Sequence, residues 1–241
     1  VSSSKMSHSL VKTRDGSRSP RQQTTNNSPF ELFFVTTNAA KFEHLRVCVQ
    51  HLLDSKVLKL TRIGSVELPE LQADSVETVA KAKAKAAWEQ LGGAVVVQDS
   101  GLVIKALSDF PGPYTKYIVS KIGIEGLLRL MDGREGLDRQ CGFNNCLAFC
   151  DNSGDIQCFS EPVQYWGTLA ETPAAETDRG GHPAEGQELF RVFIPCDEAA
   201  PRHVPLSEFT VEELAKYRAT RDSAHQLFAA WLTRRLKTSG S

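Results

Sequence analysis

The chain has 241 residues and a mass of 26.5 kDa, with 41% hydrophobic and 24% charged residues, which is the composition of an ordinary globular protein. No run of roughly 18 uncharged apolar residues occurs, and this excludes a membrane protein built on spanning helices. The formal net charge of −1 hides an asymmetry. Residues 1–29 carry five Lys and Arg side chains against Asp15 alone, a net of +4, which leaves −5 for the rest of the chain.

Residues 1–29 form a basic segment with eight serines and few large apolar side chains. Such a composition cannot bury enough apolar surface to offset the entropy of ordering, so we expect a disordered leader ahead of one domain over residues 30–241. An organellar transit peptide and a weak arm for nucleic acid are two other interpretations. The solvated leader is favoured, and nucleic acid is not an expected partner because the body is acidic.

The six cysteines, without an apolar signal peptide, indicate a reducing compartment. We therefore expect a cytoplasmic protein, or an organellar one if residues 1–29 are a transit peptide. Four of the cysteines fall within Cys141–Cys158, but in apolar runs rather than around the turns that zinc sites use. Cys146 and Cys150 are predicted to share one face of a strand, which favours a role in the core.

Strand-like and helix-like segments alternate along residues 30–241, which predicts an α/β fold with a mixed sheet. Hydrophobic patterning predicts strands at 31–36, 57–63 and 94–98 and a hairpin around Asn152-Ser153-Gly154. Periodicity and capping residues predict helices at 38–53, 75–91 and 114–131 and a helical tract with room for a break from Thr210 to about Lys237. We expect an extended loop at 66–71 and a mobile loop at 170–190.

A strand-to-helix junction carries the first group of candidate binding residues, in the segment TTNAAKFEH. A helix amino terminus presents unpaired N–H groups and partial positive charge, so it suits a phosphate group. Thr36 and Asn38 add neutral donors there, and Lys41 can reach a terminal phosphate. By itself the pattern is more typical of an asparagine cap followed by a surface lysine.

Two acidic residues form the second group. The buried strand VVVQ is expected to end in Asp-Ser-Gly, which places Asp99 at the carboxyl edge of the sheet, where open α/β sheets bind ligands. Pro69 holds Glu70 on a rigid extended loop. A glutamate that meets Asp99 around Mg²⁺ would form a site for phosphate transfer. Taken singly, Asp99 is also an ordinary turn residue.

In this order the segments resemble the inosine triphosphate pyrophosphatase family, hydrolases of non-canonical purine nucleotides. The likeness covers roughly residues 30–235. It rests on six motifs in chain order: FVTTNAAKFE, LPEL, the helix with Lys83-Ala84, QDSGL, ALSDFPGPYTKY and Arg179-Gly180. The most specific block is 95–117, because Asp-Ser-Gly-Leu followed by Pro-Gly-Pro-Tyr is an unusual combination.

The resemblance implies an elongated mixed α/β fold with two lobes around a central substrate cleft, assembled as a homodimer. It implies hydrolysis of ITP, dITP and XTP to the monophosphate and pyrophosphate with Mg²⁺, or Mn²⁺ in its place, which keeps these nucleotides out of nucleic acids. Glu70 and Asp99 are the implied metal ligands, Asp99 is also the implied general base, and Lys83 neutralises charge in the transition state. The implied substrate-binding residues are Thr36, Asn38, Lys41, Lys83, Ser100, Lys116, Phe190 and Arg221.

Several positions depart from the family pattern. Gln98 stands where a second acidic residue is usual, which removes one carboxylate from the metal region. The base-recognition stretch remains only as residues 188–193, in which Phe190 can still stack on a purine. Thr220 replaces a histidine beside Arg221. These departures leave an alternative function, a catalytically weakened nucleotide-binding or interaction protein with the same fold.

Overall fold

The computed structural model of the chain describes residues 28–176, 187–221 and 223–238. The leader expected at 1–29 therefore lies almost wholly outside the described residues, and so does much of the loop expected at 170–190, with Arg179 and Gly180. Within the described ranges, no helix has the length and apolar character needed to cross a membrane.

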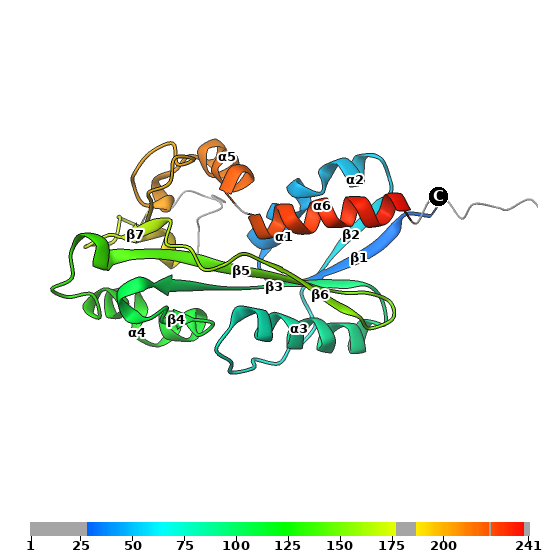
Figure 1. The fold of residues 1–241 in the computed structure, drawn as a ribbon, viewed down its shortest axis with the longest axis horizontal. Coiled ribbons are helices and arrows are strands. Elements are labelled where there is room, and N and C mark those ends of the chain that lie inside the picture. The colour runs from blue at the N-terminus through cyan, green and yellow to red at the C-terminus, as the bar shows by residue number, and fades with distance from the viewer. Residues whose placement is uncertain (1–27, 177–186, 222, 239–241) are drawn as a thin grey trace, which may run out of the picture.

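The described residues build an eight-stranded mixed sheet around which the helices pack (Figure 1). The strands run in the order β2-β1-β3-β5-β7-β8, with β4 paired to β3 and β6 paired to β5. β1 pairs in parallel with β2 and β3, whereas the other pairs are antiparallel, which confirms the mixed sheet. The strands are β1 (Phe30–Val35), β2 (Leu58–Ile63), β3 (Val95–Ile104), β4 (Pro111–Gly112), β5 (Gln140–Cys150), β6 (Ile156–Ser160), β7 (Gly167–Leu169) and β8 (Phe193–Pro195).

The helices follow the sequence prediction, with two interruptions. Val49 leaves helical geometry at φ −105° and ψ 13°, so the helix predicted at 38–53 is divided. Gly123 bends the helix predicted at 114–131 with a φ of 69°, a value that favours glycine. The helices are α1 (Ala39–Cys48), α2 (Gln50–Asp54), α3 (Val76–Leu91), α4 (Thr115–Arg129), α5 (Val211–Arg221) and α6 (Ser223–Thr238). Short 3₁₀ turns are η1 (Lys105–Leu107), η2 (Gly136–Arg139), η3 (Glu188–Arg191) and η4 (Leu206–Glu208).

Three apolar cores divide the elongated molecule into two lobes. At one end, α1, α2 and α6 cover one face of the sheet around Phe149 and Phe228, and α3 covers the opposite face through Ala84 and its neighbours (Figure 1). At the other end, Phe193 and Phe209 centre the core that joins α4 and α5 to the sheet. The long strands β3 and β5 run through both lobes. The sheet is therefore the common floor of the two lobes, as expected.

β3 is longer than predicted, so the prediction that Asp99 lies at the end of its strand is wrong. The carboxylate lies in the middle of the strand rather than at its end, because β5 pairs with all ten residues from Val95 to Ile104. The second edge of β3 is paired only near its two ends, by β1 at the first two residues and by β4 at Leu102 and Val103. Residues 97–101 consequently face an interruption in the sheet, directly beyond the carboxyl end of β1.

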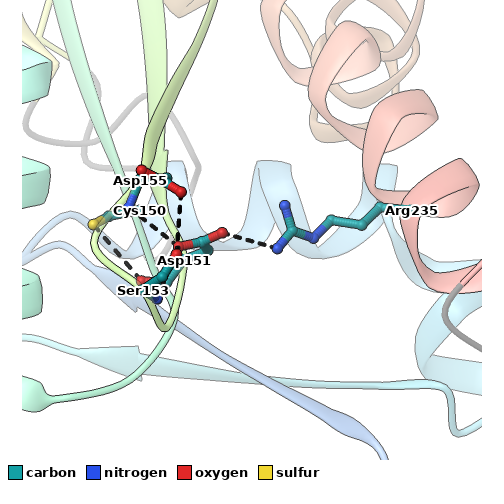
Figure 2. A network of polar contacts seen from close by, with 5 residues as sticks. All are labelled: Cys150, Asp151, Ser153, Asp155 and Arg235. Atoms are coloured by element: carbon teal, nitrogen blue, oxygen red, sulfur yellow. Dashed lines mark hydrogen bonds and ion pairs between the residues drawn. The ribbon is translucent and has the colours of Figure 1, made fainter.

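The hairpin predicted around residues 152–154 is confirmed, and a polar network anchors it to α6 (Figure 2). The Oδ1 atom of Asp151 accepts hydrogen bonds from the N–H and hydroxyl of Ser153, at 2.9 and 2.6 Å, and from the N–H of Asp155 at 3.1 Å. Its Oδ2 atom pairs with Arg235 of α6 at 3.0 Å. The hydroxyl of Ser153, with Arg235 and the two N–H groups, outweighs the opposing effect of burial and lowers the pKa of Asp151 to about 2.

Cys146 and Cys150 lie buried on the α3 face of β5, as predicted. The six cysteines of the chain are free thiols in the structure. The apolar surroundings of these two side chains fit their place in the core.

Replacing Asp151 by Asn should lower the free energy of unfolding by about 1–3 kcal/mol at pH 7, because charge-assisted hydrogen bonds are lost. A carboxylate with a lowered pKa stabilises the fold fully above its unfolded pKa and loses that effect as the pH falls through its folded pKa. The difference from the parent should therefore shrink between about pH 4 and pH 2. Urea unfolding across this range measures it, with the exposed Asp132→Asn as control. A constant difference would contradict the role given to the charge.

Candidate active site

The turn between β1 and α1 is shaped by two polar side chains. The carboxamide oxygen of Asn38 caps α1 by accepting from the N–H groups of Ala40 and Lys41, at 2.9 and 3.1 Å. The hydroxyl of Thr36 accepts the N–H of Asn38 at 3.1 Å. The segment thus turns at the carboxyl end of β1, and the amino terminus of α1 opens beside the interruption in the sheet.

Lys41 reaches from the first turn of α1 to β3. Its Nζ atom donates to the carbonyl oxygen of Gln98 at 3.5 Å, on the edge that β1 leaves unpaired. Burial lowers the pKa of Lys41 from 10.5 to about 8; Asp99 opposes this effect, and Lys83 and Lys116 add to it. Lys41 is therefore electrostatically linked to a cluster of charges on the other side of the strand.

That cluster consists of two carboxylates joined by two lysines. Lys83 of α3 contacts Asp99 at 2.9 Å and Glu70 at 3.5 Å, and Lys116 of α4 contacts Glu70 at 3.5 Å. The side chains of Lys83 and Asp99 are only 15% and 12% exposed, whereas Glu70 and Lys116 lie at the surface. The structure therefore brings Glu70, Asp99 and Lys83 together, as expected, but with Lys116 as the fourth member. Lys41, which was expected to converge on the same cleft with them, contacts the backbone of Gln98 instead.

Glu70 responds to this surrounding charge. Partial burial raises its pKa, but the coulombic effects and hydrogen bonds of Lys83 and Lys116 outweigh burial and hold it below its ordinary value. The carboxylate is thus ionised at neutral pH and available as a ligand for a cation.

Glu70 and Asp99 have the chemistry expected of a magnesium site. Both offer carboxylate oxygens, which hard cations prefer, and both converge on the ammonium group of Lys83. Magnesium at phosphate-transfer sites is usually held by one or two carboxylates together with the substrate phosphates.

A cleft opens on the opposite face of β3 and contains about 1120 Å³ of empty space, open solvent included. Because side chains alternate along a strand, Gln98 and Ser100 line this cleft while Asp99 points toward α3. Asn38 and Lys41 line the same end of the cleft. Gln98 therefore occupies the floor of the cleft and not the side on which Glu70 and Asp99 gather.

Aromatic side chains line the other end of the cleft. Phe190, on η3, lies edge-on to Phe143 of β5 with ring centroids 6.4 Å apart. Trp166 and Tyr217 complete this wall, with centroids 6.2 Å apart. One end of the cleft is thus polar and cationic, and the other offers flat apolar surfaces that suit a nucleobase.

Several lining residues could not be recognised in the sequence. Phe143 of β5, Trp166 in the loop before β7, and Tyr217 and Arg218 of α5 come from segments that only the tertiary fold brings together, and no local motif marks them. Phe190, expected to stack on the base, lies in the wall of the cleft. Arg221 ends α5, but its side chain, like Arg179, lies outside the described part of the structure.

Comparison with known proteins gives the same fold and a coherent set of relatives. Residues 32–183 match the model of the Ham1 family. A dITP/XTP pyrophosphatase of Methanopyrus kandleri is 33% identical over 201 residues, which cover 83% of this chain and 95% of the relative. An inosine triphosphate pyrophosphatase of Tuber melanosporum is 37% identical over 141 residues, covering 58% of this chain and 68% of the relative.

Two solved structures share the architecture. The HAM1 protein of Coxiella burnetii aligns with a TM-score of 0.62 at 19% identity, and the Ham1 protein of Staphylococcus aureus with a TM-score of 0.61 at 20% identity. Each alignment covers 85% of this chain and 99% of the other. The elongated two-lobed fold is therefore shared along most of the molecule.

The low pKa of Lys41 predicts an unusual pH dependence of nucleotide binding. Lys41 should lose its charge between about pH 7 and 9, and the dissociation constant for ITP should rise roughly tenfold across this range, since a charged hydrogen bond is worth about 1.5–3 kcal/mol. Calorimetry in EDTA measures the effect without turnover. Lys41→Arg stays charged and should remove the rise, relative to Lys59→Arg on the exposed face of β2. An identical rise in both variants would contradict this assignment.

Proposed function

We propose, since the chain belongs to the Ham1 family, that it hydrolyses non-canonical purine nucleoside triphosphates such as ITP, dITP and XTP to the monophosphate and pyrophosphate. The observation that carries the proposal is the Lys83–Asp99 pair on one face of β3, electrostatically linked to Lys41 at one end of a cleft on the other face, whose far end is aromatic. This arrangement matches the two chemical parts of a nucleotide.

Because one end of the cleft is cationic and the other aromatic, a nucleotide would bind in one orientation. Lys41 is half-buried and within electrostatic reach of Asp99, Lys83 and Lys116, so a triphosphate near it would meet cationic charge in a partly desolvated region. The base would extend toward Phe190 and Trp166 at the other end. Asn38 at the lysine end and Ser100 on the floor supply neutral hydrogen-bonding groups to the cleft. Thr36 contributes through the turn that holds Asn38.

Asp99 is placed to act as the general base. Its carboxylate would accept a proton from a water molecule whose oxygen attacks the α-phosphorus, and the bond from that phosphorus to the bridging oxygen of pyrophosphate would break. Lys83 contacts Asp99 at 2.9 Å and, with Lys116, would offset negative charge that develops on the phosphates. Phosphoryl transfer depends chiefly on such positioning and charge, so no special nucleophile is needed.

A divalent cation completes the proposed reaction. Glu70 and Asp99 would hold Mg²⁺, with Mn²⁺ as a substitute, because their carboxylates face one another across Lys83. The bound cation supplies charge neutralisation to the phosphates. Glu70 lies on an exposed loop, which would allow its carboxylate to move from the lysines to the cation.

A homodimer is also proposed. Phe110, Tyr117 and Ile122, large apolar side chains of α4 and the loop before it, are 37%, 61% and 44% exposed. Large apolar side chains that gather at a surface are typical of protein interfaces. A second copy of the chain is the occupant that the family resemblance implies, and the mass in solution tests it.

A panel of ITP, dITP, XTP, GTP and ATP with Mg²⁺ tests the activity. We expect pyrophosphate release from ITP, dITP and XTP. Asp99→Asn should lower kcat by at least roughly 100-fold, as expected on loss of a general base, whereas Asp132→Asn, at an exposed site, should leave kcat unchanged. Circular dichroism must show that both variants are folded, because Asp99→Asn leaves Lys83 with one carboxylate partner fewer.

Full activity of Asp99→Asn would overturn the assigned role. Binding of ITP without turnover by the parent protein would instead favour the alternative of a nucleotide-binding protein that has lost activity, to which the neutral Gln98 on the floor of the cleft lends support.

A further inference from the structure

The α3 face of the sheet carries a pair of thiols that the proposed reaction does not use. Cys146 of β5 and Cys158 of β6 both pack into the apolar core between the sheet and α3. The register places Cys146 opposite Ser160 and Cys158 opposite Ala148, so the two thiols are diagonal neighbours on adjacent strands. A hydrogen bond joins them. The pair is therefore a polar contact within an apolar core.

The two thiols differ in their access to solvent and in their electrostatic surroundings. Cys146 is completely buried, whereas Cys158 is half-buried. Exposed Lys81 of α3 is near enough to Cys158 to favour its thiolate, and Glu77, which pairs with Lys81 at 2.6 Å, opposes this effect. Exposure and the ammonium group both favour the thiolate at Cys158, with Cys146 as its hydrogen-bond donor.

The hydrogen bond moves the pKa values of the two thiols in opposite directions. It lowers the pKa of Cys158, with a further contribution from Lys81, and outweighs the opposing effect of burial. The same bond, together with burial, raises the pKa of Cys146. Cys196 is more exposed, but partial burial of its thiol and the carboxylate of Asp197 raise its pKa. Because the thiolate is the nucleophilic form of cysteine, Cys158 has the more reactive surroundings.

The thiol pair borders the reaction centre in two ways. Cys146 lies directly opposite Asp99 in the register of β3 and β5, on the face that α3 covers. α3 itself carries Lys81 near Cys158 and, two residues later, Lys83 in contact with Asp99. A change in size or charge at Cys158 therefore acts on Cys146 and on α3, both of which adjoin Asp99.

From this arrangement we propose that Cys158 is a site of oxidation by hydroperoxides and that its oxidation lowers the activity of the neighbouring reaction centre. The thiolate sulfur attacks one oxygen of hydrogen peroxide, so that an S–O bond forms and the O–O bond breaks. Sulfur is oxidised to a sulfenic acid, the peroxide is reduced, and the departing hydroxide takes a proton from solvent and leaves as water. The added oxygen must be accommodated against Cys146 and α3. Only the effect on activity rests on the proposed function.

Thiol labelling identifies the reactive cysteine without reference to activity. Limiting iodoacetamide at pH 7, followed by mass spectrometry of peptides, should label Cys158 at least roughly tenfold faster than Cys196, since one pKa unit changes the thiolate fraction about tenfold. Cys146→Ala removes the hydrogen-bond donor and should slow this labelling. Lys81→Gln, at an exposed position, should also slow it, by a smaller factor. Faster labelling of Cys196 or Cys48, or an unchanged rate in both variants, would overturn the proposal.

Hydrogen peroxide tests the oxidation and its consequence. Dimedone, which traps sulfenic acids, should be found on Cys158. In parallel samples without the trap, peroxide should lower pyrophosphate release from ITP at least roughly threefold in the parent and in the matched control Cys196→Ser, but not in Cys158→Ser, because small displacements at a reaction centre have effects of this size.

An equal loss of activity in the parent and both variants would show that the damage lies elsewhere, and trapping at Cys158 with full activity would contradict the link to Asp99. If the untreated parent protein releases no pyrophosphate, the proposed function fails. The position of the trapped sulfenic acid still decides whether Cys158 is the site of oxidation.

Discussion

The site depends on an interruption in the sheet at the middle of β3. β5 pairs along the whole strand, so β3 is held extended and its side chains alternate between the two faces. On the other edge, β1 and β4 pair only near the ends and leave residues 97–101 open. Lys41 can therefore reach the backbone of Gln98 from α1, while Lys83 meets Asp99 from α3. If a strand had paired with β3 along this whole edge, the closed sheet would have separated the ammonium group of Lys41 from that of Lys83.

The same interruption explains how an acidic body can accommodate a polyanion. Net charge describes the whole surface, whereas Lys41, Lys83 and Lys116 are close enough for their mutual repulsion to contribute to the lowered pKa of Lys41. Asp99 and Glu70 compensate only part of this charge, so a triphosphate would complete the neutralisation. The aromatic end of the cleft belongs to the lobe of α5, whereas Lys41 belongs to the lobe of α1. The sheet that both lobes share therefore sets the distance between the sites proposed for the base and the phosphates.

The sequence could predict those parts of the site that depend on residues close together in the chain. The Asn38 cap and the start of α1 depend on neighbouring residues, so they were predictable, whereas the residues that converge on Asp99 were recognised by resemblance to a family. The position of Asp99 within its strand was predicted wrongly, because the length of β3 is set by β5, some forty residues later in the chain. The face occupied by Gln98 depends on that same pairing, and the wall around Arg218 depends on the packing of α5 and η3.

The most direct test is the structure of a complex with an ITP analogue that resists hydrolysis between the α- and β-phosphorus atoms. One nucleotide should span the interruption in the sheet, with its phosphates in contact with Lys41 and Lys83, its α-phosphate nearest to Asp99, and its base against Phe190 and Trp166. A base bound at the lysine end, or phosphates bound away from residues 97–101, would contradict the orientation on which the proposed reaction rests.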